Sequence, residues 1–597
     1  INHFNKELLP GGYLGVDIFF VISGFVITSS LNERPSKNFK DFISGFYERR
    51  LKRLVPALSV FVLITSILIC LFNPSPGVAL RTGIASLFGI SNLYLLQQST
   101  DYFSQSTQLN VFTQTWSLGV EEQFYILFPL LIWCSGFGRQ TKNGDRNIFL
   151  TVFVLTIASL IAFIYLYINN QSAAYFLMPT RFWEMSSGCL LFLYLKKSPL
   201  ANERFKSIPS SLLLILIIAI MYLPSFLAIG STISVVALTF ILIGSLTNKK
   251  AAYKILTNPR VNFIGLISYS LYLWHWGVLS LSRWTIGIHW WSFPFQLLII
   301  FLLSAASYKW VEKPLRNGTW FEHRWKNILF ITKVMFLVSL SLVVLGRPLK
   351  GRLYTGDPYN KWNLRGYGET KIINNSARPT VFLLGDSHAG HYGAVMQYLS
   401  KKEDFNFIMH PQGEGLNIKK GKGTIELILS PLRKYKNIFK KGDIVILSSN
   451  IGEYRGKGEF LNAYKTFIKN TNKIGMKYFL ISPTPIFDVF KKGDTCQEEW
   501  YRPKWAISSI CLTQKNKNDW IDSNNDSLIS INKFLLSNPE VSYIDTFSIL
   551  CPDQICRNHD NQFLMYKDAH HLTSYGAMKM SKVLETLLFS NQGNFVK

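Results

Sequence analysis

The sequence predicts a multi-span α-helical membrane domain followed by a soluble α/β domain with a mainly parallel sheet. The 597 residues are 48% hydrophobic and only 17% charged, but the two kinds are unevenly distributed along the chain. Before Arg347, long apolar runs alternate with short basic loops, as in membrane proteins. After it, no run approaches the roughly 20 apolar residues that a span needs, and strands alternate with helical stretches. We expect a membrane domain at 1–325, an additional transmembrane helix at 326–346, a linker at 347–379 and a soluble domain at 380–597.

The membrane part is predicted to cross the bilayer ten times. The basic clusters fall on every second loop only if the segment 82–97 does not cross fully, so we expect that segment to be re-entrant or to lie at the surface. This count leaves the C-terminal domain on the non-cytoplasmic side. The expected spans are 14–31, 56–72, 120–137, 148–168, 183–195, 211–223, 226–246, 263–281, 293–311 and 328–345.

The net charge of +27 does not indicate a nucleic-acid partner. Much of the basic charge lies in loops beside spans, where membrane topology explains it. The lysines of the soluble part lack the interleaved aromatic residues of a single-strand platform. An anionic glycan or lipid surface stays open as a partner.

The cysteines separate into two groups. Cys70, Cys134 and Cys189 lie in apolar spans and are expected to pack as small hydrophobic residues. The other four lie in the soluble part, where three pairings are open. We favour nearest-neighbour disulfides, which place that domain in an oxidising compartment; a zinc site is the competing interpretation. The favoured pairs are Cys496 with Cys511 and Cys551 with Cys556.

Several ionisable residues lie in or beside the predicted spans. Such residues are costly in a bilayer, so they mark functional sites, although a helix cap or a structural ion pair is the simpler alternative. The predicted topology sorts them onto two sides. On the outer half we expect His3, Asp17, Glu121, Glu122, Arg181, Glu184 and His275. On the inner side we expect Arg50, Arg53, Glu312 and Arg316.

Four motifs in the membrane part resemble the acyltransferase-3 family. They are Pro-Gly-Gly-Tyr-Leu-Gly-Val-Asp-Ile-Phe-Phe at 10–20, with His3 at the family's spacing before it, Arg-x-x-Arg at Arg50 and Arg53, Trp-Ser-Leu-Gly-Val-Glu-Glu-Gln-Phe-Tyr at 116–125 and Val-Glu-Lys-Pro-Leu-Arg at 311–316. The resemblance covers residues 3 to about 320. The part of the first span that precedes His3 in the family is absent, so we expect residue 1 not to be a true N-terminus.

This resemblance implies acyl transfer across a bilayer from cytoplasmic acetyl-CoA to a glycan outside. Arg50 and Arg53 suit the phosphates of acetyl-CoA at the inner face. His3 suits a general base or a transient acyl carrier. Asp17, Glu121 or Glu122 would orient it, and the sequence does not choose among them.

A nucleophilic triad is predicted in the soluble part. The apolar strand at 380–384 runs into Gly385-Asp386-Ser387-His388, which places Ser387 at the carboxyl end of a strand, where ligands bind in α/β sheets. Asp568 and His571 precede a helix near the C-terminus. Ser387 as nucleophile, His571 as base and Asp568 as its orienting group follow the usual triad logic.

The soluble part also resembles the SGNH hydrolase family, which implies a three-layer α/β fold. Its first block is Gly-Asp-Ser and its last is Asp-x-x-His, and His571 is preferred over His570 because Leu-Thr follows it. Gly413 and Asn450 are the candidates for the oxyanion glycine and asparagine, although the family's Gly-x-Asn-Asp block is missing around Asn450.

Together the two resemblances imply a bacterial O-acetyltransferase of the inner membrane, with its C-terminal domain in the periplasm. The expected donor is acetyl-CoA, and no metal is expected. The expected acceptor is a cell-surface polysaccharide or its lipid-linked precursor, with O-antigen or lipopolysaccharide favoured over peptidoglycan. The open alternatives are a membrane-anchored carbohydrate esterase, a non-enzymatic glycan or lipid transporter, and direct transfer by the membrane part without Ser387.

Overall fold

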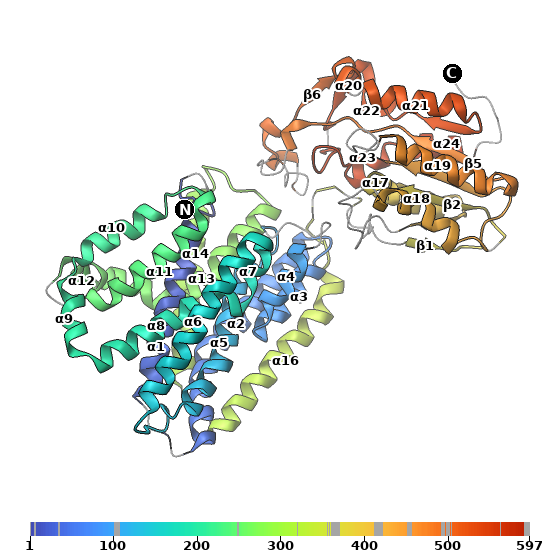
Figure 1. Cartoon of the computed structure of the whole chain (residues 1–597). Coiled ribbons are helices and arrows are strands. Elements are labelled where there is room, and N and C mark those ends of the chain that lie inside the picture. The colour runs from blue at the N-terminus through green and yellow to red at the C-terminus, as the bar shows by residue number, and fades with distance from the viewer. Residues whose placement is uncertain are drawn as a thin grey trace. The chain divides into compact units, whose positions relative to one another are not determined.

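The computed structural model of the chain contains two compact units. One is Ile1–Ser282 with Ile288–Lys350, and the other is Gly351–Lys597 with the short segment Arg283–Gly287 (Figure 1). The structure describes all residues except 1, 5–7, 34–35, 37, 101–107, 248–249, 319, 355, 358, 360–369, 376, 411–421, 450–456, 491–495, 497–501, 503, 524, 561–562 and 590–597.

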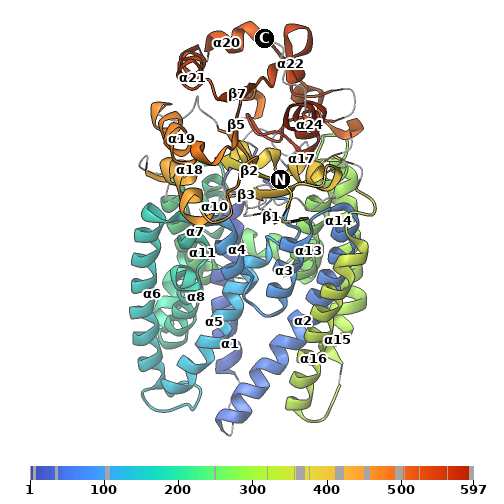
Figure 2. The ribbon, with the colours of Figure 1, turned by 90° about the vertical axis from the view of Figure 1, so that its right-hand side faces the viewer.

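The first unit is entirely helical in its described residues, and its long helices run side by side (Figure 2). Six of them are long and apolar enough to cross a membrane: Gly12–Asn32, Phe39–Phe72, Gly144–Asn169, Ala228–Ser245, Phe293–Asn317 and Arg324–Leu349. The helices are α1 (Gly15–Asn32), α2 (Phe39–Phe72), α3 (Gly77–Leu87), α4 (Ser91–Thr100), α5 (Thr115–Cys134), α6 (Gly144–Asn169), α7 (Gln171–Phe176), α8 (Met178–Lys197), α9 (Pro199–Ser207), α10 (Ser210–Ile220), α11 (Ala228–Ser245), α12 (Ala251–Leu256), α13 (Pro259–Trp284), α14 (Phe293–Ser307), the π-helical turn η3 (Tyr308–Glu312), α15 (Lys313–Asn317) and α16 (Arg324–Leu349). The chain is therefore a multi-pass membrane protein.

The expected re-entrant segment 82–97 is not one continuous helix. It falls on α3 and α4, which are separated by a turn at Gly89 with φ of +67°. The 11 residues of α3 extend about 16 Å at the usual rise per residue, well short of a bilayer core of about 30 Å. Neither helix spans a membrane alone.

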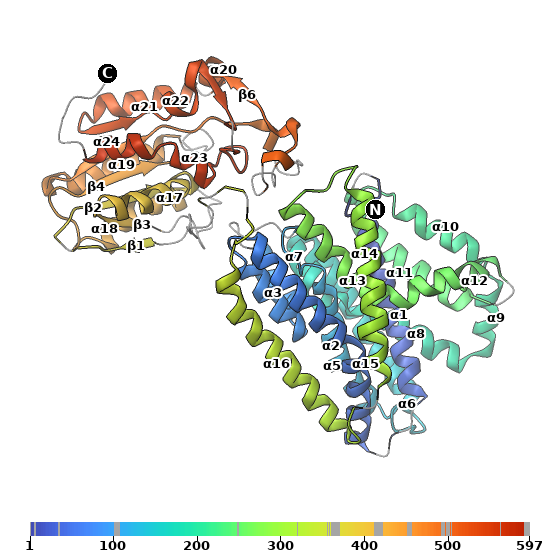
Figure 3. The same ribbon diagram turned by 180° about the vertical axis from the view of Figure 1, so that it is seen from behind.

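One local expectation is wrong. The residues expected in a basic cytoplasmic loop before Pro56 belong instead to α2, which is continuous from Phe39 to Phe72 with Pro56 inside it. Arg, Lys and Leu are good helix formers, so the basic stretch extends the span as helix. Arg50 and Arg53 are thus on a rigid element. Figure 3 shows α16 running beside α2, against which it packs.

Two glycines bring α1 and α8 into close contact. A Cβ atom on Gly24 would lie 1.8 Å from the Met185 carbonyl oxygen, and one on Gly188 would lie 2.0 Å from that of Val21. Only small residues permit this approach of two helix backbones. The contact fixes Asp17 of α1 relative to the first turns of α8.

The second unit contains a six-stranded sheet with the order β1-β3-β2-β4-β5-β7. Neighbouring strands from β3 to β7 are parallel, and β1 is antiparallel to β3 at the edge. The elements are β1 (Thr370–Ile372), β2 (Thr380–Gly385), α17 (Ser387–Lys402), β3 (Asn406–Met409), α18 (Lys422–Lys434), β4 (Ile444–Ser448), α19 (Lys457–Thr471), β5 (Lys477–Ile481), β6 (Gln514–Asn516), α20 (Lys517–Ser523), α21 (Asn525–Ser537), β7 (Val541–Ile544), α22 (Phe547–Leu550), β8 (Ile555–Arg557), α23 (Ser574–Met578) and α24 (Ser581–Phe589).

The unit has three layers. Alternate residues of β2 enter two different cores: Val381 and Leu383 pack with α17, α23 and α24, whereas Phe382 and Leu384 pack with α18, α19 and α21. Both faces of the sheet are therefore covered, which explains the continuous apolar run of this strand. The expected α/β fold with a mainly parallel sheet is confirmed. The helix expected after Asp568 and His571 near the C-terminus is present as two short helices, α23 and α24.

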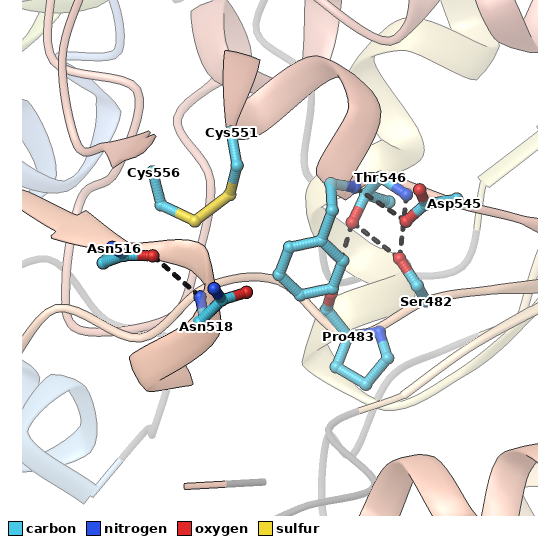
Figure 4. Close-up of a disulfide and its surroundings, with 9 residues drawn as sticks. Ser482, Pro483, Asn516, Asn518, Asp545, Thr546, Cys551 and Cys556 are labelled. Carbon is cyan, nitrogen blue, oxygen red and sulfur yellow. Dashed lines mark hydrogen bonds between the residues drawn. A yellow bond between two sulfur atoms is a disulfide. The ribbon is translucent and has the colours of Figure 1, made fainter. Parts of the chain in front are cut away.

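Both expected disulfides are present. Cys496 bonds to Cys511, and Cys551 bonds to Cys556. Figure 4 shows the second bond beside Asn516 and Asn518, which lie on β6 and α20. It closes a turn from α22 into β8, the strand that pairs with β6.

Candidate functional site

The turn after β2 is built for a reactive serine. Gly385 has φ of +136°, and a Cβ atom there would lie 1.8 Å from the Ser448 carbonyl oxygen of β4. Asp386 caps α17, since its Oδ1 accepts a hydrogen bond of 2.8 Å from the His388 amide. Ser449, just beyond β4, donates to Asp386 Oδ2 at 2.7 Å. Because β3 lies on one side of β2 and β4 on the other, this turn lies at the switch point of the sheet.

The structure brings the three predicted triad residues together. His571 Nε2 lies 2.7 Å from Ser387 Oγ, and His571 Nδ1 lies 2.9 and 2.8 Å from the two carboxylate oxygens of Asp568. The Asp568 carboxylate also accepts the His571 amide at 2.8 Å, which closes a tight local turn. Nucleophile, base and orienting carboxylate therefore form one continuous hydrogen-bonded chain.

The electrostatics of the pair suit a general base. Burial lowers the pKa of His571 to about 4, an effect that the hydrogen bond and charge of Asp568 oppose. Burial raises the pKa of Asp568, but the hydrogen bond from His571 together with the charges of His571, Lys567 and His570 outweighs burial and leaves that pKa below its ordinary value. At neutral pH, Asp568 is thus ionised and His571 is neutral. With Nδ1–H directed at the carboxylate, Nε2 carries the lone pair toward Ser387.

Three more histidines surround the triad. His388 Nε2 lies 2.9 Å from His570 Nδ1, so one imidazole donates a hydrogen bond to the other. His391 is also buried, and its Nδ1 accepts the Leu572 amide at 3.4 Å. Burial, and then the neighbouring histidines, lower the pKa of both His388 and His391. These two rings are neutral at pH 7.

The expected oxyanion residues are not placed. Gly413 and Asn450 both lie outside the described residues. Within the described part, Ser449 is the residue at this end of β4 that touches the turn of the nucleophile. Ser449 was not predicted as part of the site, because a serine after a buried strand has no distinctive sequence signature.

In the helical unit, Asp17, Arg181 and Glu184 form one fully buried ionic cluster. Arg181 Nη1 lies 2.5 Å from Glu184 Oε1, and Nη2 lies 3.2 Å from Asp17 Oδ1. The Arg181 guanidinium also lies over the rings of Trp116 and Tyr175, at 5.6 and 5.4 Å from the centroids. The cluster joins α1, α5 and α8, three helices that sequence reasoning had only placed on the same side.

His3 and His275 meet in the structure. Their rings stack at a centroid distance of 5.4 Å, and the His3 ring makes an edge contact of 4.9 Å with Trp276. His275 Nδ1 lies 2.7 Å from the Tyr272 carbonyl oxygen, so its N–H points there and Nε2 is the basic nitrogen. His3 is exposed, which leaves it accessible to a reacting group.

Arg50 lies closer to the predicted outer residues than expected. Its guanidinium lies 4.8 Å from the centroid of the Tyr125 ring, and Tyr125 donates a hydrogen bond to Glu121, which also accepts one from Ser23. The assignment of Arg50 and Glu121 to separate sides of the membrane is therefore too coarse, because they share Tyr125. Sequence reasoning missed Tyr125 as the linking residue, although it lies one helical turn after Glu121.

The remaining predicted inner residues are spread along η3, α15 and α2. Buried Glu312 accepts a hydrogen bond of 3.1 Å from Ser270 and lies 3.9 Å from the guanidinium of Arg316. Arg53 is exposed. Glu122 is partly buried, beside Glu121 on α5.

Two family models match the chain in succession. The acyltransferase domain model matches residues 2–309, about half of the chain, and the model of the SGNH domain fused to such acyltransferase domains matches residues 355–586. The two matches fall on the helical unit and on the three-layer unit. They agree with both resemblances read from the motifs.

Similar proteins are O-acetyltransferases by name. The chain is 33% identical to O-acetyltransferase OatA of Staphylococcus aureus strain NCTC 8325 / PS 47 over 334 residues, which are 53% of this chain and 55% of that relative. The same values hold for O-acetyltransferase OatA of Staphylococcus aureus strain COL. The chain thus spans about half of the length of the relatives it matches. No solved structure is significantly similar to it.

The two family models match the chain in the same order as its two units. The helical unit with its buried ionic cluster comes first, and the three-layer unit with Ser387, His571 and Asp568 follows. The chain belongs to the acyltransferase family, as a member whose acyltransferase domain is fused to an SGNH domain.

Proposed function

We propose that this protein is a membrane O-acetyltransferase that moves an acetyl group from cytoplasmic acetyl-CoA to a hydroxyl group of a cell-surface polysaccharide. One observation carries the proposal. A hydrogen-bonded Ser387–His571–Asp568 chain lies in the same polypeptide as a multi-span acyltransferase domain. A triad built for acyl transfer requires an acyl donor, and a multi-pass domain of this family provides a route for one across the bilayer.

The reaction at Ser387 proceeds in two halves. His571 Nε2 removes the hydroxyl proton of Ser387 as Ser387 Oγ attacks the carbonyl carbon of the acetyl group delivered by the helical unit. The His571 imidazolium then gives that proton to the group that had carried the acetyl group and now leaves. The result is an acetyl ester on Ser387. A sugar hydroxyl next loses its proton to His571 and attacks the ester, which returns the proton to Ser387 Oγ and releases the acetylated glycan.

The helical unit delivers the acetyl group. Arg50 and Arg53 hold the phosphates of acetyl-CoA, with Arg50 oriented by the Tyr125 ring. His3, stacked on His275, accepts or activates the acetyl group at the opposite face. The Asp17–Arg181–Glu184 cluster, with Glu121 and Glu122, fixes the helices around this path.

The acceptor is an O-antigen or other lipopolysaccharide sugar, or its lipid-linked precursor, with peptidoglycan as the alternative. The unit at Gly351–Lys597 lies in the periplasm of a bacterial inner-membrane protein. Two disulfides support this location, since they persist in oxidising compartments. The relatives named O-acetyltransferase come from Staphylococcus aureus, which supports O-acetylation as the activity and keeps the peptidoglycan alternative in the test.

Glycan analysis by mass spectrometry tests the proposal. Cells that lack surface O-acetylation express the wild type, His3→Ala, Arg50→Ala or Ser387→Ala, and lipopolysaccharide and peptidoglycan are analysed separately. His323→Ala, at an exposed position, is the matched control. We expect acetylation with the wild type and the control and its loss in the three variants.

The outcomes separate the alternatives. Acetylation that persists in all three variants contradicts the proposal. Loss in His3→Ala with retention in Ser387→Ala shows direct transfer by the helical unit. A wild type that removes acetyl groups from an acetylated glycan is an esterase.

A further inference from the structure

Three histidines beside the reactive serine converge on one point. One ring nitrogen from each of His388, His570 and His571 lies within 4.8 Å of the other two. Among the described residues, this is the one group of such potential metal ligands. The His388 and His570 rings are nearly parallel, with an angle of 7° between their planes. The three residues come from α17 and from the loop before α23, so only the fold brings them together.

The loop that supplies two of the ligands is firmly held. The His570 carbonyl oxygen accepts a hydrogen bond of 2.8 Å from Thr484 Oγ1, and the Ala569 carbonyl oxygen accepts one of 2.8 Å from the Phe487 amide. His388 is buried on the first turn of α17, and His570 is only partly buried. The loop is thus held in place, and His570 is the ligand that an incoming ion can reach first.

The nitrogen spacing suits a tetrahedral metal ion. Zinc–nitrogen bonds of about 2.0 Å place neighbouring ligand nitrogens about 3.3 Å apart. His388 Nε2 and His570 Nδ1, now 2.9 Å apart, need to separate by a few tenths of an ångström. A ring nitrogen of His571 lies within 4.8 Å of those of the other two histidines and needs to move inward, and Ser387 Oγ lies 2.7 Å from His571 Nε2.

We propose that His388, His570 and His571 form a binding site for a divalent ion of the zinc type, and that the bound ion inhibits the serine centre. Each imidazole binds the ion through an unprotonated ring nitrogen and carries its N–H on the other ring nitrogen. The imidazole that now donates the hydrogen bond between His388 Nε2 and His570 Nδ1 therefore changes tautomer: a proton leaves its ligand nitrogen and one is gained on its other ring nitrogen, so that no net proton is released and no electron is transferred. His571 already has the required tautomer, with Nδ1 directed at Asp568.

Inhibition follows from the shared ligand. The lone pair of His571 Nε2 that would take the proton of Ser387 is donated to the metal instead, so the base is blocked while the ion is bound. His388 and His570 contribute affinity without acting on Ser387. The site therefore makes acyl transfer sensitive to free transition metal in the compartment of the soluble unit.

The inhibitory consequence rests on the proposed function, so binding and activity are measured separately. Full-length protein in detergent is titrated with Zn²⁺ by calorimetry, and hydrolysis of 4-nitrophenyl acetate is followed at increasing Zn²⁺ and after addition of EDTA. The variants are His388→Gln and His570→Gln, the second at a partly exposed position where folding is less at risk. His323→Gln is the control for unspecific histidine sites.

We expect one Zn²⁺ site more in the wild type and in His323→Gln than in the other two variants. The Zn²⁺ concentration for half-inhibition should rise at least about tenfold in those two variants, with hydrolysis in EDTA within about twofold of the wild type. Equal Zn²⁺ binding in all four proteins overturns the site. Zinc binding at this site without loss of hydrolysis overturns the inhibition. A wild type that hydrolyses no ester argues against the proposed function, while calorimetry still decides the metal site.

Discussion

At the scale of single residues, the hydrogen bond between Asp568 and His571 organises the candidate site of the three-layer unit. It fixes the tautomer in which His571 Nε2 faces Ser387, and it keeps a negative charge beside the ring that becomes cationic in the proposed reaction. Burial works in the opposite direction and holds the resting imidazole neutral. Both effects are needed: a neutral base at rest, and a stabilised imidazolium in the transition state.

Asp568→Asn should abolish most acyl transfer without unfolding the protein. The amide keeps the shape of the carboxylate but supplies neither its charge nor the correct tautomer, a change that costs about 10⁴ in rate in serine proteases. We expect a fall of roughly 10³ to 10⁴ in hydrolysis of 4-nitrophenyl acetate by the full chain. Asp522→Asn, at an exposed position on α20, should keep the wild-type rate. Equal rates for the two variants would show that Asp568 has no part in the reaction.

The pH profile should report the lowered pKa of His571. The base is active only when neutral, and its pKa lies at about 4 instead of the ordinary value near 6.5. Hydrolysis at low substrate concentration should therefore stay constant as pH falls from 7 to about 5 and decline only as pH falls through about 4. Return to pH 7 should restore the rate, which separates titration from denaturation. A decline centred near pH 6.5 would contradict the burial argument.

At the scale of elements, the strand-to-helix turn after β2 positions the nucleophile. The backbone of Gly385 lies so close to β4 that no side chain fits, and Asp386 is held between the amide end of α17 and Ser449. Ser387 is thereby presented at the carboxyl edge of the sheet, where β3 and β4 lie on opposite sides of β2. The position of Ser387 Oγ therefore depends on how β2 pairs with β4.

Gly385→Ala should destabilise the soluble unit far more than Gly442→Ala. Both glycines have positive φ, +136° and +87°, but a Cβ atom at 385 would overlap the Ser448 carbonyl whereas one at 442 meets nothing within 4 Å. Backbone strain alone costs about 1–2 kcal/mol, and the forced separation of β2 and β4 adds to it only at 385. Thermal unfolding of the full chain, with ester hydrolysis at 25 °C, checks the difference. Similar losses for both variants would show that strain alone governs the turn.

At the scale of the whole molecule, the chain is two units with separate cores and separate chemistry. The helical unit buries ions between helices, and the three-layer unit carries the serine centre. The extension before β1 belongs to the second unit, since buried Asp357 accepts the Tyr575 amide at 2.8 Å at the start of α23. The division between units thus falls at Lys350 and Gly351.

When the second unit is produced alone, ester hydrolysis should be retained and glycan acetylation should be lost. Residues 351–597 exported alone to the periplasm should hydrolyse 4-nitrophenyl acetate with a rate within a few-fold of the full chain, because the triad and both disulfides are complete in that unit. The same fragment should not acetylate surface glycans, because it lacks the proposed route from cytoplasmic acetyl-CoA. Glycan analysis beside the ester assay measures both. A fragment that acetylates glycans in cells would show that the helical unit is not the donor.

Much of this architecture could be predicted from the sequence because its signals are local. Apolar runs, basic loops, the Gly-Asp-Ser turn after a buried strand and the Asp-x-x-His before a helix are each read within about ten residues. The short strands β1, β3, β6 and β8 were not predicted, because they are defined by their pairing partners and not by their own composition. The continuation of α2 through the basic stretch was not predicted, because the cluster of Arg and Lys residues was interpreted as a cytoplasmic loop, although these residues also form helix.

The sequence alone was enough to predict that the chain joins a multi-span helical part to an α/β part, and to select a candidate nucleophile, base and orienting acid. For the cysteines it favoured one of three pairings, which the structure then showed. Only the tertiary structure decided what lies beside what: His571 against Ser387, Arg181 between Asp17 and Glu184, Arg50 over Tyr125, and His388 against His570. Hydrogen bonds and ion pairs form only between groups about 3 Å apart in space, whereas most of these pairs are more than a hundred residues apart in the sequence. Local sequence patterns therefore do not show which groups meet. Helix packing and sheet order, which bring such groups together, are properties of the folded chain.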